Sequence, residues 1–257
     1  MAAQASQPAT CRVCGSTSTI DAHLIPRALM HDLKGEEKYL LVGGVDAHGR
    51  KIVQSGLVDR DILCAKHDGI LGVYDKYGIE FCRTFNSHIT HPAPNIWRIS
   101  EVNSEKLVKF WLSILWRFSI SCLPEAKDVK LGPYEYKIQD ILFATASCSV
   151  EPEITMLRYR STVIPPENIC AAPYKTLYPG LDEKLRRNAY GIALAGFQAF
   201  IKVDAQPLPF PLHQITINGK GEINGGYLNF EGTHQFRRMH KVAKNMGLKP
   251  QAINLKK

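Results

Sequence analysis

The sequence lacks a hydrophobic segment long enough to cross a membrane. Its longest apolar stretch, residues 107–122, is interrupted by Lys109 and Arg117, whereas a membrane-spanning helix needs about 20 mostly apolar residues. Residues 1–10 also lack the basic and apolar segments of a secretory signal peptide. We therefore expect a cytoplasmic protein in which residues 1–10 form a disordered tail.

The motifs of several common enzyme classes are also missing. The sequence contains no Gly-rich phosphate-binding loop, no nucleophile elbow and no Ser, His and Asp in the order of a catalytic triad. Acidic residues are the minority, with 24 Asp and Glu against 32 Lys and Arg, and none follows Glu231. This excess of positive charge favours a polyanionic partner such as nucleic acid.

Cysteine and histidine, in contrast, occur in two pairs with the spacing of a zinc site. Cys11 and Cys14 form the first pair, and Cys64 and His67 form the second. Each pair places two ligands on one tight turn, and two such turns supply the four ligands of a tetrahedral zinc ion. Gly15 suits a knuckle in which a side chain would crowd the turn. The alternatives are a redox pair, which would need a βαβ pattern around it, or two unrelated thiols.

Short strands and a helix are expected between and after these pairs. Residues 39–44 and 51–54 are typical of two short strands, and a helical period begins after Cys64. Knuckle, hairpin and helix in this order predict a zinc-bound treble-clef (ββα-metal-like) module over residues 11–85. Residues 88–94, with two His and two Pro, are expected to form a linker.

A mixed helix and strand domain is expected over residues 95–257, so the predicted fold class is α+β. This domain is also the expected surface for a protein partner or a second copy of the chain. The periodicity and turn residues predict helices starting at Ser104, at Tyr134 and at Asp182 (to Leu194), strands over 153–163 and 197–203, a hairpin of 213–218 with 222–227, and a basic C-terminal helix capped by Thr233.

The zinc-ligand motifs and the residues beside them resemble the HNH endonuclease superfamily. The likeness is closer still to a set of uncharacterised bacterial HNH-like proteins, because residues 112–117 read Leu-Ser-Ile-Leu-Trp-Arg and residues 131–135 read Leu-Gly-Pro-Tyr-Glu. It extends to about residue 140. In the zinc module it rests on Cys11, Cys14, His23, Ile25, Pro26, Leu63, Cys64 and His67.

This resemblance implies a metal-dependent endonuclease that cleaves phosphodiester bonds, with DNA as substrate ahead of RNA, in a bacterial defence or mobile-element setting. His23 would be the general base, Asp68 a ligand of a magnesium or manganese ion, and Asp59 the orienting group in place of the family's Asn. Six basic residues are expected to bind the phosphates of nucleic acid: Arg27, Lys66, Arg237, Arg238, Lys241 and Lys244. The alternative is that they form a solvated charged face.

Four positions depart from the family's pattern. Two of them are Asp59 in place of Asn and His67 in place of Cys, which zinc accepts readily. Ala22 stands where the family has the Asp before its base, and Asp21 comes one place too early, although on an extended strand it shares the face of His23. Asp68 replaces the His that closes the second knuckle, and magnesium accepts a carboxylate oxygen there. The alternative function is therefore a catalytically inactive zinc module that binds nucleic acid or a protein partner.

Overall fold

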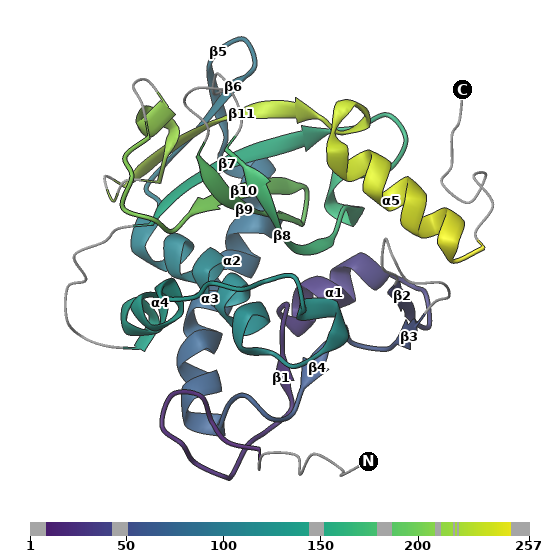
Figure 1. Cartoon of the computed structure of the whole chain (residues 1–257). Helices are drawn as coiled ribbons and strands as arrows, with labels where there is room; N and C mark the ends of the chain where they lie inside the picture. Colours follow the sequence, from purple (N-terminus) through teal and green to yellow (C-terminus); the bar gives the residue numbers. More distant parts are fainter. Residues whose placement is uncertain are drawn as a thin grey trace.

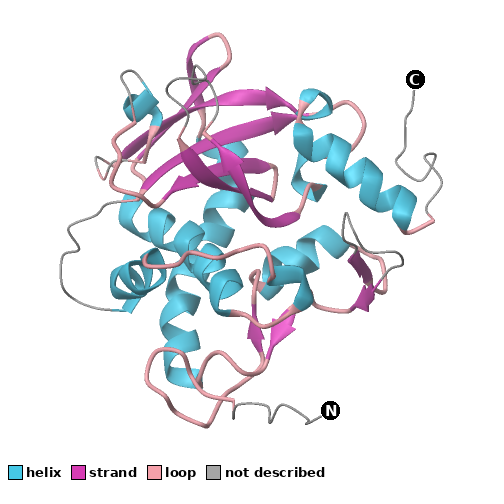
Figure 2. Cartoon of the chain, in the orientation of Figure 1, coloured by secondary structure: helices cyan, strands magenta, loops and turns pink. Residues whose placement is uncertain are grey.

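The computed structural model describes residues 9–42, 51–143, 152–178, 187–208, 212–217, 219 and 221–247. These residues form a mixed α+β structure, as expected. Figures 1 and 2 show a seven-stranded sheet with a group of helices on one of its faces, and the short N-terminal strands beyond those helices. No helix in these ranges combines the length and the apolar character that crossing a bilayer requires.

The N-terminal part consists of short elements that precede one long helix. Strand β1 pairs antiparallel with β4, and β2 pairs antiparallel with β3 as the strand pattern predicted. Helix α1, which follows Pro26, was not predicted. The elements are β1 (Ala22–His23), α1 (Arg27–Lys34), β2 (Leu40–Val42), β3 (Lys51–Val53), β4 (Val58–Asp59) and α2 (Ala65–His88).

Helix α2 joins this part to the rest of the chain without a linker. It begins after Cys64, as predicted, and ends at His88. The expected linker over residues 88–94 is wrong, because strand β5 (Thr90–Ala93) starts two residues later and forms a hairpin with β6 (Ile96–Ser100). Asn95 makes the turn with a φ of 62°, a left-handed conformation that Asn tolerates better than most residues. The division into two domains stays a prediction.

Two further helices pack beside α2. Helix α3 (Ser104–Ile120) is capped by the Asn103 side chain, which accepts a hydrogen bond from the Lys106 amide, and not by Ser104 as expected. Helix α4 (Tyr134–Phe143) matches its prediction. A Cβ atom on Gly78 of α2 would collide with the ring of Phe110 on α3. The glycine therefore allows the two helices to approach closely.

The sheet combines strands that are consecutive in the sequence with strands that lie far apart. Its order is β5-β6-β11-β7-β10-β9-β8, and every neighbouring pair is antiparallel except β7 and β11. The remaining strands are β7 (Glu153–Arg160), β8 (Ala171–Leu177), β9 (Asn188–Leu194), β10 (Phe197–Lys202) and β11 (Glu222–Asn229). The chain also contains short 3-10 helices at Pro124–Ala126, Pro166–Asn168, Leu212–Ile215 and Phe230–Gly232.

Two sequence predictions fail in this sheet. The expected helix over residues 182–194 is wrong, because residues 188–194 form β9; residues 179–186 lie outside the described part. The expected hairpin is also wrong, because residues 212–215 form a 3-10 turn and β11 pairs with β6 and β7 instead. The partners of β11 are distant in the sequence, so local pattern did not reveal them, whereas β9 pairs with β10, which follows it directly.

Aromatic side chains fix the helices on the sheet. Phe81 and Phe85 of α2 lie 5.9 and 4.8 Å, centroid to centroid, from Phe197 of β10. Phe85 also lies 5.1 Å from Trp97 of β6, edge to face, a geometry that aromatic pairs favour. The far end of α2 is thus held in the core, while its N-terminal end extends away from the sheet (Figure 1).

The last helix, α5 (His234–Asn245), begins where sequence predicted. The Thr233 hydroxyl accepts a hydrogen bond from the Phe236 amide as the N-cap. Phe236 and Met239 pack against a small cluster that includes Tyr159 and Phe230. One face of α5 is therefore held against the sheet, and the other face is left to solvent.

Candidate metal centre and the adjoining groove

The first pair of cysteines lies on a tight turn that the backbone itself closes. The amide of Gly15 donates to the carbonyl of Cys11, and the amide of Cys11 donates to the carbonyl of Ser16, each at 2.8 Å. Gly15 has a φ of +72°, and a Cβ atom there would meet nothing within 4 Å. The glycine is therefore required by its left-handed backbone and not, as expected, by crowding.

Backbone hydrogen bonds bring the second pair to this turn. The amide of Arg12 donates to the carbonyl of Ile62, and the amide of Ile20 donates to that of Leu63, both at 2.9 Å. Cys64 follows directly as the N-cap residue of α2, and His67 lies in the first turn of that helix. The two pairs, about 50 residues apart in sequence, thus face each other.

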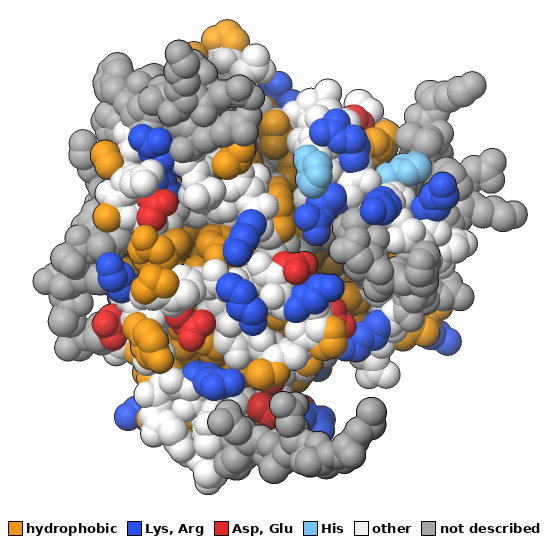
Figure 3. All heavy atoms as spheres, viewed as in Figure 1, with side chains coloured by type: hydrophobic (Ala, Val, Ile, Leu, Met, Phe, Trp, Pro, Cys, Tyr) orange, Lys and Arg blue, Asp and Glu red, His pale blue; other side chains and the backbone are white. Residues whose placement is uncertain are grey.

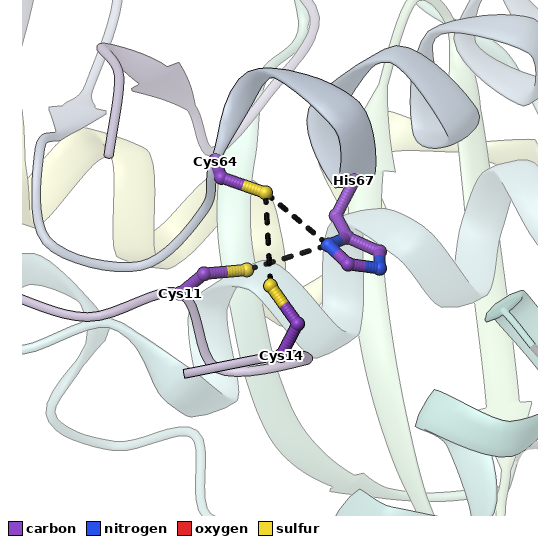
Figure 4. A group of neighbouring side chains, drawn as sticks. All are labelled: Cys11, Cys14, Cys64 and His67. Atoms are coloured by element: carbon purple, nitrogen blue, oxygen red, sulfur yellow. Dashed lines mark hydrogen bonds between the residues drawn. The ribbon is translucent and has the colours of Figure 1, made fainter. Parts of the chain in front are cut away.

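The four predicted ligands form one cluster (Figure 4). All four ligand atoms of Cys11, Cys14, Cys64 and His67 lie within 4.8 Å of one another. The distances are 3.9 Å from Cys14 Sγ to Cys64 Sγ, and 3.5 and 3.3 Å from His67 Nδ1 to the sulfurs of Cys11 and Cys64. A zinc tetrahedron with its usual bond lengths has edges of about 3.8 Å between sulfurs and about 3.6 Å between sulfur and nitrogen. The cluster has the size and donor set to hold such an ion.

The local electrostatics also suit a cation. Burial opposes ionisation of Cys11, but backbone hydrogen bonds from Cys64, Val13 and Cys14 outweigh it and lower the pKa of the thiol. The backbone amide of His67 lowers the pKa of Cys64, and the N-terminal end of α2 adds its positive dipole. At Cys14 a backbone hydrogen bond from Ser16 acts in the same direction, but burial and the two nearby thiols prevail and raise the pKa. A bound cation would relieve this repulsion between sulfurs.

His23 lies beside this cluster, on the strand that the sequence predicted. It ends β1, where its backbone is opposite Val58 of β4. Its ring Nε2 lies 3.3 Å from Ser55 Oγ, which leaves Nδ1 available. Burial lowers the pKa of His23 below its ordinary value, and Arg27 and Arg117 add to this effect, while Asp68 and Asp21 oppose it. The imidazole is therefore held in its neutral form.

His23 and Asp68 line the same groove, which has a volume of about 460 Å³ and lies between α1 and α2. Arg27, the first residue of α1, lines it as well. Burial raises the pKa of Asp68, Asp75 adds to this rise, and Arg117 and His23 oppose it. The groove therefore combines a neutral imidazole with a carboxyl group that a cation would ionise.

A buried ion pair lies in the same groove. Arg117 of α3, whose side chain is 2% exposed, donates from both terminal nitrogens to the Asp75 carboxylate at 3.2 and 2.6 Å. Ser113 Oγ lies 3.4 Å from the same carboxylate. Neither residue of the pair was predicted as a site residue. The available signal was a charged Arg inside the apolar stretch 107–122, because a buried Arg needs a partner.

Other predicted site residues lie elsewhere. Asp59 is 5% exposed and accepts hydrogen bonds from the Ser121 hydroxyl at 2.6 Å, the Cys122 amide at 3.2 Å and the Asp61 amide at 2.9 Å. It ties β4 to the end of α3 and does not line the groove. Asp21 pairs with Arg60 at 2.8 Å, and Lys66 lies exposed on α2; neither lines the groove.

The predicted basic residues of the C-terminal helix are separate from this groove. Arg237, Lys241 and Lys244 are exposed on α5, and Arg238 lies over the ring of Tyr174 at 5.3 Å from its centroid. Figure 3 shows Lys, Arg and His side chains gathered over this helix. The basic residues of α5 therefore form a positively charged outer face that is separate from the groove.

Comparison with known proteins gives no relative. No family model matches the chain, and neither a curated protein nor a solved structure matches it.

Proposed function

We propose that this chain is an HNH-like endonuclease, in which a zinc-bound treble clef positions His23 and Asp68 for phosphodiester cleavage. One observation carries the proposal: these two residues line the same groove, and Asp68 directly follows His67 of the metal cluster in the sequence. The resemblance to HNH endonucleases had assigned them to base and cation ligand on sequence alone. Zinc is the ion that best fits a donor set of this kind.

In the proposed reaction His23 is the general base. Its Nε2 is directed at Ser55, so that Nδ1 accepts a proton from a water molecule in the groove. The resulting hydroxide attacks the phosphorus, the bond from phosphorus to the leaving oxygen breaks, and that oxygen takes a proton from solvent. The lowered pKa of His23 keeps this nitrogen unprotonated at neutral pH.

Asp68 is the proposed protein ligand of the catalytic cation. Magnesium binds through one or two carboxylates together with substrate phosphate oxygens, so a single carboxylate beside the scissile phosphate suits it. Such an ion, when bound, stabilises negative charge on the phosphate and on the leaving oxygen. Arg27, which lines the groove at the start of α1, is placed to hold the same phosphate.

A plasmid-nicking assay with magnesium, manganese or chelator tests the proposal. We expect cation-dependent nicking by the wild type and at least a hundredfold loss in His23→Ala, since a general base contributes about 10²–10⁴-fold. His31→Ala is the matched control, because His31 is exposed on α1 and does not line the groove. Equal nicking by wild type and His23→Ala would reject the proposal, provided that zinc content is unchanged.

The second candidate is a catalytically inactive zinc module that binds nucleic acid or a protein. It is favoured by the shortage of free carboxylates near His23: among the described residues, Asp21 is paired with Arg60 and Asp75 with Arg117. The same assay separates the two functions, because this candidate predicts no nicking with any cation while nucleic acid still binds in a salt-dependent way.

A further inference from the structure

The groove extends along α2 well beyond His23. From α2 it is lined by residues at helical spacing, which include Asp68, Gly72, Lys76 and Arg83. At 1.5 Å per residue, the span from Asp68 to Arg83 is about 22 Å. Arg83 donates to both carboxylate oxygens of Asp32 on α1, at 2.8 and 2.9 Å. This ion pair joins the two helices at the end of the groove farthest from the metal cluster.

At Gly72 no side chain extends into the groove. A glycine in the middle of a helix is less favourable than alanine. Packing does not require it here, because a Cβ atom on Gly72 would meet nothing within 4 Å. Gly78, two turns later, differs in this respect, since a Cβ atom there would collide with Phe110. The missing side chain at residue 72 therefore leaves room in the groove itself.

Two cations flank this open position. Arg27 and Lys76 both line the groove, and neither has an ion-pair partner in the part of the chain that the structure describes. The carboxylate of Glu80 lines it as well, one helical turn beyond Lys76. Along the helix axis Lys76 lies about 12 Å beyond Asp68, too far to contact the phosphate at His23 and Asp68. The charge of Arg117, in contrast, is already balanced by Asp75.

We propose that a single strand of nucleic acid lies along this groove, with its backbone over Gly72, its scissile phosphate at Arg27 and a neighbouring phosphate at Lys76. This inference rests on the proposed function for the identity of the scissile phosphate. The groove has a volume of about 460 Å³. Its described lining offers two cations without an ion-pair partner, Arg27 and Lys76, which suits phosphates of one backbone.

Fluorescence anisotropy with a labelled 20-nucleotide single strand, and with its duplex, tests this proposed strand-binding site directly. The probe is titrated with the zinc-loaded full chain, without added magnesium, at several salt concentrations. We expect Gly72→Leu to weaken binding of the single strand at least tenfold. Gly69→Leu is the matched control, because Gly69 also has open space on α2 but does not line the groove; we expect its affinity to equal that of the wild type.

Lys76→Glu provides a second, exposed substitution that does not depend on how α2 accepts a leucine. Lys76→Ala should lower the salt slope of single-strand binding by about 0.7, the value for one lost phosphate contact, and Lys76→Glu should weaken binding further. Wild-type affinity in both Gly72→Leu and Lys76→Glu, or tighter binding of the duplex than of the single strand, would overturn the inference.

The cleavage and binding assays can reject the proposed nuclease and the proposed strand-binding site independently. Loss of binding in Gly72→Leu, with no cleavage by the wild type of either the plasmid or the labelled single strand, keeps the proposed strand-binding site and rejects the nuclease. Cleavage that depends on His23, together with unchanged binding in Gly72→Leu and Lys76→Glu, keeps the nuclease and rejects the proposed strand-binding site.

Discussion

Removing the carboxylate of Asp75 should destabilise the protein strongly. In Asp75→Ala, the guanidinium of Arg117 stays buried, with 2% of its side chain exposed, but loses both of its charged acceptors. Its Nε already lacks a hydrogen-bond partner within the described residues. Breaking a buried pair in this way costs about 3–5 kcal/mol, which corresponds to a fall in Tm of about 6–20 °C for a chain of this size.

The matched control is an ion pair of similar length on the surface. Lys109 and Glu105 lie 2.6 Å apart on α3, but Glu105 is 75% exposed, so Glu105→Ala should cost less than about 1 kcal/mol. Both variants are compared with wild type by thermal melting and urea titration. Replacing the buried pair with Asp75→Leu and Arg117→Met together should recover most of the loss. A cost in Asp75→Ala no larger than that in Glu105→Ala would refute the reasoning.

Three further predictions concern packing, pH and metal. Gly78→Ala should lower the free energy of unfolding by about 1–3 kcal/mol in urea titration, despite the better helix propensity of alanine, because its Cβ would collide with Phe110; an unchanged or higher value would contradict the close α2–α3 contact. The pKa of His23 is lowered in the folded state, so the unfolded chain binds more protons as the pH falls through about 6.5 and below, and the stability of the protein should decline there. In thermal melts, His23→Gln should show a smaller decline in Tm between pH 7.5 and 5.5. An identical decline would contradict the shift. A chelator should lower the Tm of the wild type, and metal analysis should find one zinc per chain that is lost in Cys64→Ser; a zinc content and Tm unaffected by either change would contradict the metal centre.

The metal cluster and helices α2, α3, α4 and α5 could be predicted because their signals are local, whereas α1 was not predicted. The spacing of Cys11, Cys14, Cys64 and His67 predicted a cluster that the structure brings together. Helices α2, α3, α4 and α5 carry apolar residues at helical period, and their prediction was confirmed apart from the end of α2 and the cap of α3. In each case a few neighbouring residues contain the information.

The sheet could be predicted only in part. Sequence pattern predicted strands where β7 and β10 lie, but it did not predict β8, β9 or the pairing of β11, which depend on contacts between strands. Gly191 lies in the middle of β9, and a Cβ atom there would collide with Tyr174 of β8. Its role is visible only when the two strands are paired. Likewise, β11 lies between β6 and β7, and nothing within its own residues specifies those neighbours.

The candidate site was predicted in part for the same reason. His23 and Asp68 follow from motif positions, and they do line one groove. Ser55, Asp75 and Arg117 were missed because their contacts arise from tertiary structure, with Asp75 and Arg117 on different helices. Asp59, which motif position had suggested as an orienting group, makes its hydrogen bonds with the end of α3 and its own turn; its catalytic role stays a prediction.

Chemical rescue is the most direct test of the central claim, that the imidazole of His23 is the base of a nuclease. The His23→Gly variant, loaded with zinc, is assayed for nicking with magnesium and increasing imidazole, while zinc content is followed. The account predicts no detectable cleavage without imidazole and a saturable recovery with it, steepest where imidazole is neutral. Cleavage by the variant at the wild-type rate, or no recovery at any imidazole concentration while zinc is retained, would contradict it.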